Sequence, residues 1–561
     1  MLAKCLNRVG RVPLTHIGRS LNVSAGCSQS VLPWFKNVPR FADKVALNDT
    51  NGSYTYENIF LSAKELAEDI SKKMEGKTNE RILFMCPNNV NYVISLWAIW
   101  MSGQVAVPLS PHHPQNLLLY YINDSKPEML ISSPSFKEIS SGLAKSTHTK
   151  LLVLDDNMEL NCSKQKAQTN NDFEDRLPQS FYEKNDALII YTSGTTGSPK
   201  GVVSSHRNLS AQVGMLLEAW KWSFNDAILH TLPLNHVHGV VNALLCPLTA
   251  GAKIKMLPKF DTKSVWNYLL GIDVKPDIRD INIYMAVPTI YFQLIDYFDR
   301  VFSNDEKMKR HILNTLQTKL RLMVSGSAPL PQTVFQRWLE ISGHELLERY
   351  GMTEIGMCLS NPYGSKREAG FVGNPLPGVT VRISQKDDNE NFLPLVEGSN
   401  IDGKVNINIS ENADGENPSG HLLVKGEAVF KEYFRRPEAT KKEFTEDGFF
   451  ITGDICQYNT EKKLFKILGR ESVDIIKSGG YKLSALQIET QLMNNPDIKE
   501  CAVVGLPDDK WGERVAAVVV LQNGKSMTID DLKSWADGNM PKYSTPSVLK
   551  IVEAIPKNNM G

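Results

Sequence analysis

The sequence has no excess of charge of either sign. Its 561 residues include 62 Lys and Arg and 62 Asp and Glu, so the formal net charge at pH 7 is zero. A chain without a net field is not drawn as a whole to nucleic acid or to an anionic membrane, and any charged ligand must be recognised locally. Hydrophobic residues make up 42% of the chain and charged residues 22%, which excludes a collagen, a coiled coil or a wholly disordered protein.

Patterns of cysteine and glycine that mark several other classes are missing. The eight cysteines are scattered without a Cys-x-x-Cys pair, which argues against a disulfide framework or zinc site and indicates buried reduced thiols. No two of the 37 glycines stand two residues apart, so the G-x-G-x-x-G fingerprint of dinucleotide-binding folds is absent. The uncharged stretches 90–109 and 235–252 contain Pro108 and Pro247, and each predicts a buried helix followed by a buried strand instead of a membrane span.

Acidic residues are missing from the amino terminus. The first 42 residues contain no Asp or Glu, while Lys, Arg and Ser recur among them. This composition is typical of an organelle transit peptide, and a disordered basic tail is the alternative. We predict that residues 1–30 are a transit peptide that directs the protein to the mitochondrial matrix.

Short apolar runs rich in β-branched residues alternate with segments of helical periodicity over most of the chain. These runs are 81–86, 105–109, 129–132, 151–154, 187–191, 283–287 and 320–324. The alternation predicts α/β layers with largely parallel sheets. The later runs 379–383, 421–424 and 464–468 predict an antiparallel or barrel-like region. The polar stretches 155–176 and 385–420 show no periodicity and are predicted to be mobile loops.

A compact α+β pattern starts again after Arg470. It comprises a predicted helix at 485–492, strands at 501–504 and 515–521, and a helix from Ile529. We therefore predict an α/β protein with a large N-terminal domain, residues 31–469, built of layered α/β subdomains and a β-barrel-like part. A small mobile α+β C-terminal domain, residues 470–561, follows.

The segment with the most chemical information follows the buried run at 187–191. It is Thr192, Ser193, Gly194, Thr195, Thr196, Gly197, Ser198, Pro199 and Lys200. Backbone N–H groups and hydroxyls in such a loop can surround phosphate oxygens, and Lys200 adds a positive charge. The spacing is not that of the Walker loop, and a flexible Gly/Ser/Thr surface loop is the alternative.

This segment resembles the signature loop of the adenylate-forming superfamily, which includes acyl-CoA synthetases, firefly-type luciferases and peptide-synthetase adenylation domains. Further motifs of that family follow in the same order, and the resemblance covers the chain from about residue 30 onward. They are Y-G-x-T-E at 350–354, T-G-D at 452–454, the hinge at Gly469 and Arg470, the glycine loop at 476–482 and W-G-E at 511–513.

The resemblance implies that a carboxylic acid is activated with ATP and then transferred to CoA. Glu354 would ligate Mg²⁺, Thr353 would contact the α-phosphate, and Asp454 would accept both ribose hydroxyls. The other residues implied to bind ATP are the loop 192–200, Tyr350 and Arg470. The implied catalytic residues are Thr192, Lys200, His236 and Glu354. Gly479, Gly480 and Lys482 would line the CoA tunnel.

The amino-acid sequences of two segments, 322–330 and 347–357, are similar to those of malonyl-CoA synthetases of the mitochondrial type. Malonate or methylmalonate is therefore the expected acid, and its second carboxylate needs a cation, for which we predict Arg321. A basic residue at this position also occurs in relatives that take neutral acids, so a structural role for Arg321 is the alternative. The remaining residues predicted to contact the acid are His236, His238, Ser325, Gly326, Ser327 and Met352.

The chain departs from the family pattern in two places. Ser472 stands where relatives often have Asp or Lys, which leaves the expected domain rotation in place. The family's final catalytic lysine is expected to follow Gly561, and Lys557 should not be given its role. Two other functions remain open: a ligase for medium-chain or aryl acids, and a noncatalytic nucleotide-binding protein of the same fold.

Overall fold

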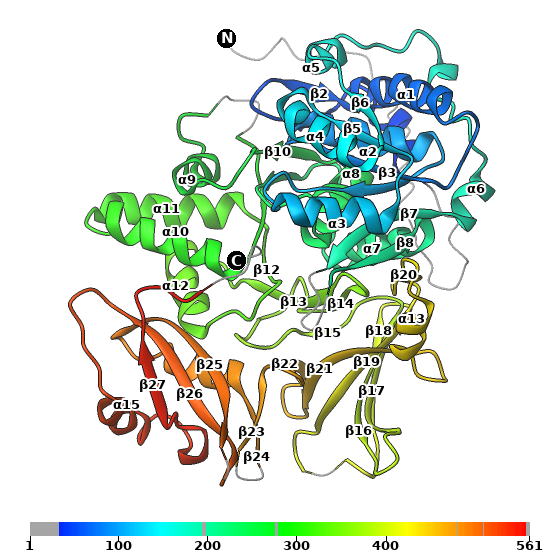
Figure 1. Ribbon diagram of the computed structural model, residues 1–561. Coiled ribbons are helices and arrows are strands. Elements are labelled where there is room, and N and C mark those ends of the chain that lie inside the picture. Colours follow the sequence, from blue (N-terminus) through cyan, green and yellow to red (C-terminus); the bar gives the residue numbers. More distant parts are fainter. Residues whose placement is uncertain are drawn as a thin grey trace, which may run out of the picture.

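The computed structural model describes residues 33–192, 198–274, 279–413, 415–478, 481–508 and 510–556. The predicted transit peptide, loop residues 193–197, Gly479, Gly480 and Lys557 lie outside these residues. Within them, the chain forms two largely parallel sheets, one antiparallel sheet and a smaller terminal sheet (Figure 1). The predicted mixed α/β fold is confirmed.

The first sheet has seven strands in the order β20-β8-β7-β4-β3-β5-β6. Its central strands are parallel, and β8 is antiparallel to β7. The bounds are β3 Arg81–Met85, β4 Val105–Pro108, β5 Met129–Ser132, β6 Lys150–Val153, β7 Asp186–Thr192, β8 Lys200–Ser205 and β20 Glu432–Tyr433. The helices of this part of the chain are α1 Tyr56–Lys73, α2 Val90–Met101, α3 Gln115–Ser125, α4 Lys137–Thr147, α6 Gln179–Lys184 and α7 His206–Ala219.

The second sheet has nine strands in the order β15-β14-β13-β12-β11-β9-β10-β1-β2, and the six from β13 to β1 are parallel. Their bounds are β1 Val45–Asn48, β2 Ser53–Thr55, β9 Ala227–His230, β10 Lys253–Met256, β11 Ile283–Ala286, β12 Leu322–Ser325, β13 Leu347–Met352, β14 Gly356–Ser360 and β15 Asn374–Pro375. The helices around it are η4 His238–Leu245, α8 Cys246–Ala250, α9 Thr262–Leu270, α10 Pro288–Val301, α11 Glu306–Lys319 and α12 Gln332–Ser342.

Both uncharged stretches fold as predicted. All twelve residues of α2 are buried, and the chain then enters the buried strand β4. The second stretch forms η4 and α8 and leads into β10. In the ranges that the structure describes, no helix is both long enough and apolar enough to cross a membrane. The cysteines described are free thiols, five of them buried.

The third sheet is antiparallel and has the order β18-β17-β16-β19-β21-β22. Its strands are β16 Val379–Lys386, β17 Phe392–Ile401, β18 Lys404–Ile409, β19 Ser419–Gly426, β21 Phe450–Asn459 and β22 Leu464–Arg470, and α13 Pro437–Lys442 lies between β20 and β21. The prediction of a loop over 385–420 is wrong, because β17 and β18 occupy much of it. The segment 155–176 likewise contains the short helices α5 Met158–Cys162 and η3 Asn170–Phe173.

The terminal sheet has a core of its own. Its strands are ordered β24-β23-β26-β25, and β27 pairs with β26. The elements are β23 Ile475–Ser478, β24 Tyr481–Ser484, α14 Ala485–Leu492, β25 Ile498–Asp508, β26 Gly512–Leu521, α15 Ile529–Ala536 and β27 Val548–Ile551. Ile488, Leu492, Val519 and Leu532 pack together between this sheet and its two helices. Figure 1 shows this unit below α12 and beside the antiparallel sheet.

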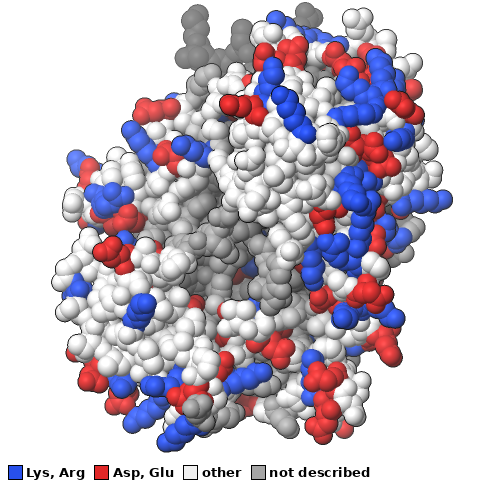
Figure 2. Space-filling view, in the orientation of Figure 1, with Lys and Arg blue, Asp and Glu red and all other residues white. Residues whose placement is uncertain are grey.

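Surface charges agree with the composition. On the face shown in Figure 2, Lys and Arg side chains are interspersed with Asp and Glu. Neither sign covers a whole lobe of that face, so the view supports local recognition of any charged ligand.

Candidate active site

One large cavity lies where the parallel strands of both sheets end, and its volume is about 1640 Å³. Thr192, Ser325 and Met352 line it from the carboxyl ends of β7, β12 and β13. Ligands of open α/β sheets bind at this edge, because loops that leave parallel strands meet there. The third sheet contributes Asp454 and Arg470 to the same cavity.

The predicted residues meet in this cavity with few exceptions. Those that line it are Thr192, Ser198, Lys200, His236, His238, Ser325, Ser327, Tyr350, Met352, Thr353, Glu354, Asp454 and Arg470. Residues 193–197 lie outside the described residues. Pro199 and Gly326 stand next to lining residues, and Arg321 does not line the cavity.

We name three regions of the cavity by the part of the ligand predicted for each: the phosphate side around Thr192, Ser198 and Lys200, the nucleotide side around Tyr350, Asp454 and Arg470, and the acyl side around His238, Ser325 and Ser327. The phosphate side is held by polar contacts from the first sheet and its helices. Tyr120 of α3 donates a hydrogen bond to the carbonyl of Pro199 at 2.7 Å, and Tyr191 donates to Asp124 at 2.8 Å. These contacts fix the ends of β7 and β8 that flank the predicted phosphate loop. Lys200 Nζ lies 3.6 Å from Glu443 Oε1 and 4.4 Å from the centroid of the Tyr433 ring.

The nucleotide side joins β13 to the third sheet. The Tyr350 hydroxyl donates to Asp454, and Arg470 Nε lies 3.1 Å from the other Asp454 oxygen. Burial raises the pKa of Asp454, while Arg470 opposes this rise. Glu354 is buried and accepts a 2.9 Å hydrogen bond from the Tyr433 hydroxyl, and burial also raises its pKa.

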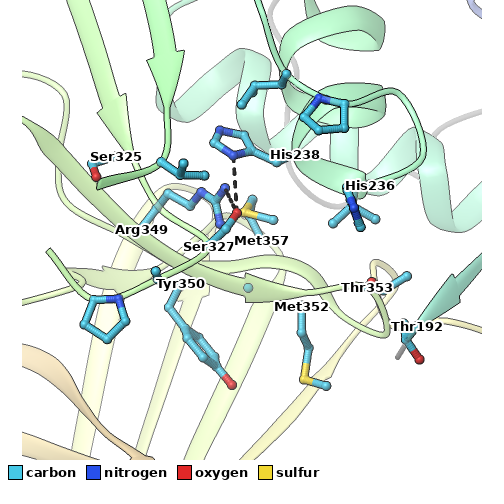
Figure 3. A pocket seen from close by; sticks show the side chains of 18 of the residues that line it. Thr192, His236, His238, Ser325, Ser327, Arg349, Tyr350, Met352, Thr353 and Met357 are labelled. Atoms are coloured by element: carbon cyan, nitrogen blue, oxygen red, sulfur yellow. Dashed lines mark hydrogen bonds between the residues drawn. The ribbon is translucent and has the colours of Figure 1, made fainter. Parts of the chain in front are cut away.

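The acyl side contains three polar side chains that point toward one another (Figure 3). Ser327 Oγ lies 3.3 Å from His238 Nδ1 and accepts a 3.3 Å hydrogen bond from Arg349 Nη2. Ser327 has a φ of 70°, a left-handed conformation that non-glycine residues adopt at a cost of about 1–3 kcal/mol. The strained backbone therefore belongs to the residue whose hydroxyl lies between the His238 ring and the Arg349 guanidinium.

Arg349 is the charged residue that sequence reasoning missed. It is 4% exposed, and no carboxylate pairs with it among the residues that the structure describes. Burial lowers its pKa to about 9, and its Nε is buried without a hydrogen-bond partner there. An isolated buried charge destabilises the protein, and an anionic ligand that paired with Arg349 would offset this cost, whereas a neutral ligand would not. The available signal was its place directly before Tyr350 in the Y-G-x-T-E motif.

Gly326 makes room for this guanidinium. A Cβ atom at Gly326 would stand 2.5 Å from both Cζ and Nε of Arg349, a separation that real side chains do not reach. The predicted involvement of Gly326 in acid binding is therefore indirect in this geometry, since it acts on the position of Arg349.

The prediction that Arg321 contacts the acid is wrong. Its Nε and Nη2 donate to the two oxygens of Asp226 at 2.6 and 2.7 Å, and its Nη1 donates to the Trp220 carbonyl at 3.0 Å. Asp226 is 3% exposed, so this bidentate pair satisfies a buried carboxylate. The guanidinium is already occupied and has a structural role.

The two candidate histidines are not in a strand. His236 lies in a bend and His238 begins the π-helical segment η4, and both residues line the cavity. Burial lowers the pKa of His236 to about 4, with a smaller contribution from His113. Burial also lowers the pKa of His238 well below its ordinary value. Both rings are therefore neutral near pH 7.

The small domain enters the cavity by a different element from the one predicted for CoA. Gln487, Thr490 and Gln491 of α14 line it, whereas none of the described residues of β23 and β24 does. Lys482 lies in β24, paired with Lys477. The CoA roles of Gly479, Gly480 and Lys482 stay predictions.

Comparisons with known proteins identify the family of this chain. A family model described as AMP-binding enzyme matches residues 34–434, and a model of the AMP-binding enzyme C-terminal domain matches residues 487–561. The chain belongs to the AMP-binding enzyme family. Resemblance to adenylate-forming enzymes is thereby confirmed.

Individual members of the AMP-binding family are similar along almost the whole chain. Mitochondrial malonate–CoA ligase ACSF3 of Xenopus laevis is 43% identical over 558 residues, which cover 97% of this chain and 92% of the relative. ATP-bound MatB of Rhodopseudomonas palustris has a TM-score of 0.77 at 29% identity, covering 94% of this chain and 96% of that one. A malonyl-CoA ligase complex with methylmalonyl-CoA and AMP has a TM-score of 0.61 at 29% identity, covering 92% and 97%.

The Arg321–Asp226 pair predicts a loss of stability without a specific loss of function. Arg321→Ala should lower the free energy of unfolding by about 2–4 kcal/mol, because it leaves Asp226 buried without its cation. Urea or thermal unfolding measures this change. Arg300→Ala, which removes an exposed ion pair with Asp296, is the control and should cost less than about 0.5 kcal/mol. A stable Arg321 variant that has lost only acid selectivity would contradict this account.

The contact between Gly326 and Arg349 predicts a second effect. Gly326→Ala should lower kcat/KM for the acid by about 10- to 100-fold, because the added methyl group displaces the guanidinium. KM for ATP should change much less. Gly364→Ala is the control, since nothing lies within 4 Å of its Cβ position. Equal losses for acid and ATP would show that the effect is not local to Arg349.

Proposed function

We propose that this chain is an ATP-dependent malonate:CoA ligase that also accepts methylmalonate. In the first step, a carboxylate oxygen attacks the α-phosphorus of ATP and pyrophosphate leaves. In the second step, the CoA thiolate attacks the acyl carbon and AMP leaves, which yields malonyl-CoA. The full-length similarity to malonate–CoA ligases supports this reaction.

The observation that carries the choice of acid is the buried guanidinium of Arg349, which has no carboxylate partner in the part of the chain that the structure describes. Malonate has two carboxylates, and the distal one must stay ionised in a cavity that is partly closed to water. Arg349 would pair with that distal carboxylate, while Ser327 and His238 would donate or share hydrogen bonds beside it. A neutral acid would leave this buried charge uncompensated, which disfavours medium-chain and aryl acids.

The reacting carboxylate would lie between the acyl and phosphate sides. Figure 3 shows His236 on the side of the pocket that carries Thr192 and Thr353. A neutral His236 could donate a hydrogen bond to the carboxylate without withdrawing its charge, and so orient it toward the α-phosphate. Thr192, Thr353 and Lys200 would distribute the charge of the polyphosphate.

Glu354 fits the Mg²⁺ that accompanies ATP in our proposal. Its carboxylate is buried in the cavity wall, and Tyr433 donates to only one of its oxygens. A carboxylate oxygen is the ligand type that Mg²⁺ prefers, and the bound ion would neutralise phosphate charge during the transfer. Asp454 would accept the ribose hydroxyls, and Arg470 keeps it oriented.

The protein is proposed to act in the mitochondrial matrix. The acid-free, Ser-bearing amino terminus supports this location, and the ACSF3 relative is described as mitochondrial. The proposed CoA contacts from Gly479, Gly480 and Lys482 would require the small domain to rotate after the first step.

Acid-dependent exchange of pyrophosphate into ATP tests the function directly. The full natural chain should show exchange with malonate and methylmalonate, and much less with butyrate or benzoate. Omitting the acid gives the background. Exchange with benzoate or butyrate at the rate for malonate would overturn the assignment, and nucleotide binding without any exchange would favour a noncatalytic protein.

Removal of Arg349 should separate dicarboxylic from monocarboxylic acids. Arg349→Ala should lower kcat/KM for malonate about 30- to 1000-fold, because the distal carboxylate loses its cation. This loss corresponds to roughly 2–4 kcal/mol of transition-state stabilisation. Loss for butyrate should be less than about tenfold, since it has no distal charge. Matched losses for the two acids would reassign Arg349 to a structural role.

The amino terminus gives a separate test of location. Residues 1–42 fused to a soluble reporter should carry it into mitochondria, because the segment is basic and free of acidic residues. Fluorescence microscopy and protease protection report the result. A fusion in which the basic residues are replaced by Gln is the control, and a cytosolic reporter with the native segment would refute the proposal.

A further inference from the structure

The phosphate side of the cavity holds an ion pair whose acidic member, Glu443, has no part in the proposed reaction. Lys200 Nζ lies 3.6 Å from Glu443 Oε1, and both side chains line the cavity while remaining about one-third exposed. Lys200 also lies over the ring of Tyr433 at 4.4 Å. The lysine predicted to meet the polyphosphate is thus already paired with an acid.

The backbone holds Glu443 at this position. Its carbonyl accepts a 2.8 Å hydrogen bond from Ile451 N in β21, and its N–H donates to Thr440 O at 3.1 Å. It therefore sits where α13 ends, tied to the strand that carries Asp454. These contacts hold the backbone of Glu443, and a change of rotamer alone is enough to move its carboxylate toward or away from Lys200.

A second carboxylate is close to Glu443. Glu443 contributes to the raised pKa of Glu354, after burial as the main cause. Tyr433 contacts Lys200 and Glu354, since Lys200 lies over its ring at 4.4 Å and its hydroxyl donates to Glu354 at 2.9 Å. Glu443 therefore places a negative charge beside Lys200, in the region of the cavity where the β- and γ-phosphates would bind in the proposed function.

We propose that Glu443 is a positioning residue that competes with polyphosphate for Lys200. This inference rests on the proposed ATP-dependent function of the same cavity. ATP and pyrophosphate must displace the carboxylate from the ammonium and then bind beside a negative charge. Glu443 consequently weakens the binding of both, and it returns to Lys200 as pyrophosphate leaves, which promotes product release.

The size of the effect follows from the exposure of the pair. Ion pairs with this much solvent contact are weak, so Glu443 can be displaced by a ligand of several negative charges. Removing the carboxylate should tighten ATP and pyrophosphate binding by about threefold, the range that exposed pairs contribute. The effect should shrink at high ionic strength, because salt screens partly exposed charges.

Direct binding measurements on Glu443→Gln test this role. Titration calorimetry with Mg·ATP and with pyrophosphate, without any acid present, should give tighter binding than for the native chain at low salt. The difference in affinity between the two chains should be smaller in 0.5 M salt, because the Debye length then falls to about 4 Å and the charges are screened. Steady-state kinetics should show a lower KM for ATP and an unchanged KM for malonate. Glu446→Gln is the control, because Glu446 is exposed three residues further on and does not line the cavity.

Several results would overturn the inference. Weaker or unchanged binding of both ligands in Glu443→Gln would do so, and so would a change of the same size in Glu446→Gln or one that does not depend on salt. A lower melting temperature together with weaker binding would show that Glu443 is structural. Because no acid is present in the binding assay, tighter ATP binding would support this inference even if malonate proved not to be the substrate.

Discussion

The predicted acyl half of the cavity depends on a buried positive charge, Arg349, with which no carboxylate of the described ranges pairs. Arg349 precedes Tyr350 in strand β13, so the positions of these two cavity residues are coupled through the backbone. Ser327, whose backbone is in the left-handed conformation, accepts a hydrogen bond from Arg349. The neighbouring Gly326 leaves space for the guanidinium. An arrangement that is unfavourable without a ligand becomes favourable when an anion binds.

The phosphate and nucleotide half follows the opposite rule. Its charged groups already have partners within the protein. Lys200 pairs with Glu443, Arg470 pairs with Asp454, and Glu354 accepts a hydrogen bond from Tyr433. A ligand with several charges can exchange these partial pairings for stronger ones, whereas a weakly charged molecule cannot. Under the proposed function, the two halves would thus discriminate between ligands in different ways, by an unpaired charge on one side and by displacement of a paired group on the other.

Sequence reasoning located most of this site because its residues follow strands at recognisable motifs. The buried runs that became β3, β5, β7 and β12 are apolar and β-branched, so their existence could be predicted to within a few residues. The choice between Arg321 and Arg349 could not be made this way, because only packing shows that Asp226, almost 100 residues away, takes up Arg321. Likewise, β18 is a largely exposed edge strand, and β17, which lies between β18 and β16, contains Pro394 and Gly398, so the sequence conceals their pairing. The contribution of α14 to the cavity depends on how two domains meet.

The close approach of Gly326 to Arg349 constrains the order in which this pocket could change specificity. A methyl group at residue 326 collides with the guanidinium, so that substitution is harmful as long as Arg349 is present. Once Arg349 is replaced by a small neutral residue, the same methyl group would fill part of the space that the guanidinium leaves. The two positions are therefore epistatic, and a route toward neutral acids is open in one direction: the arginine must be lost first, and alanine at 326 becomes tolerable only afterwards.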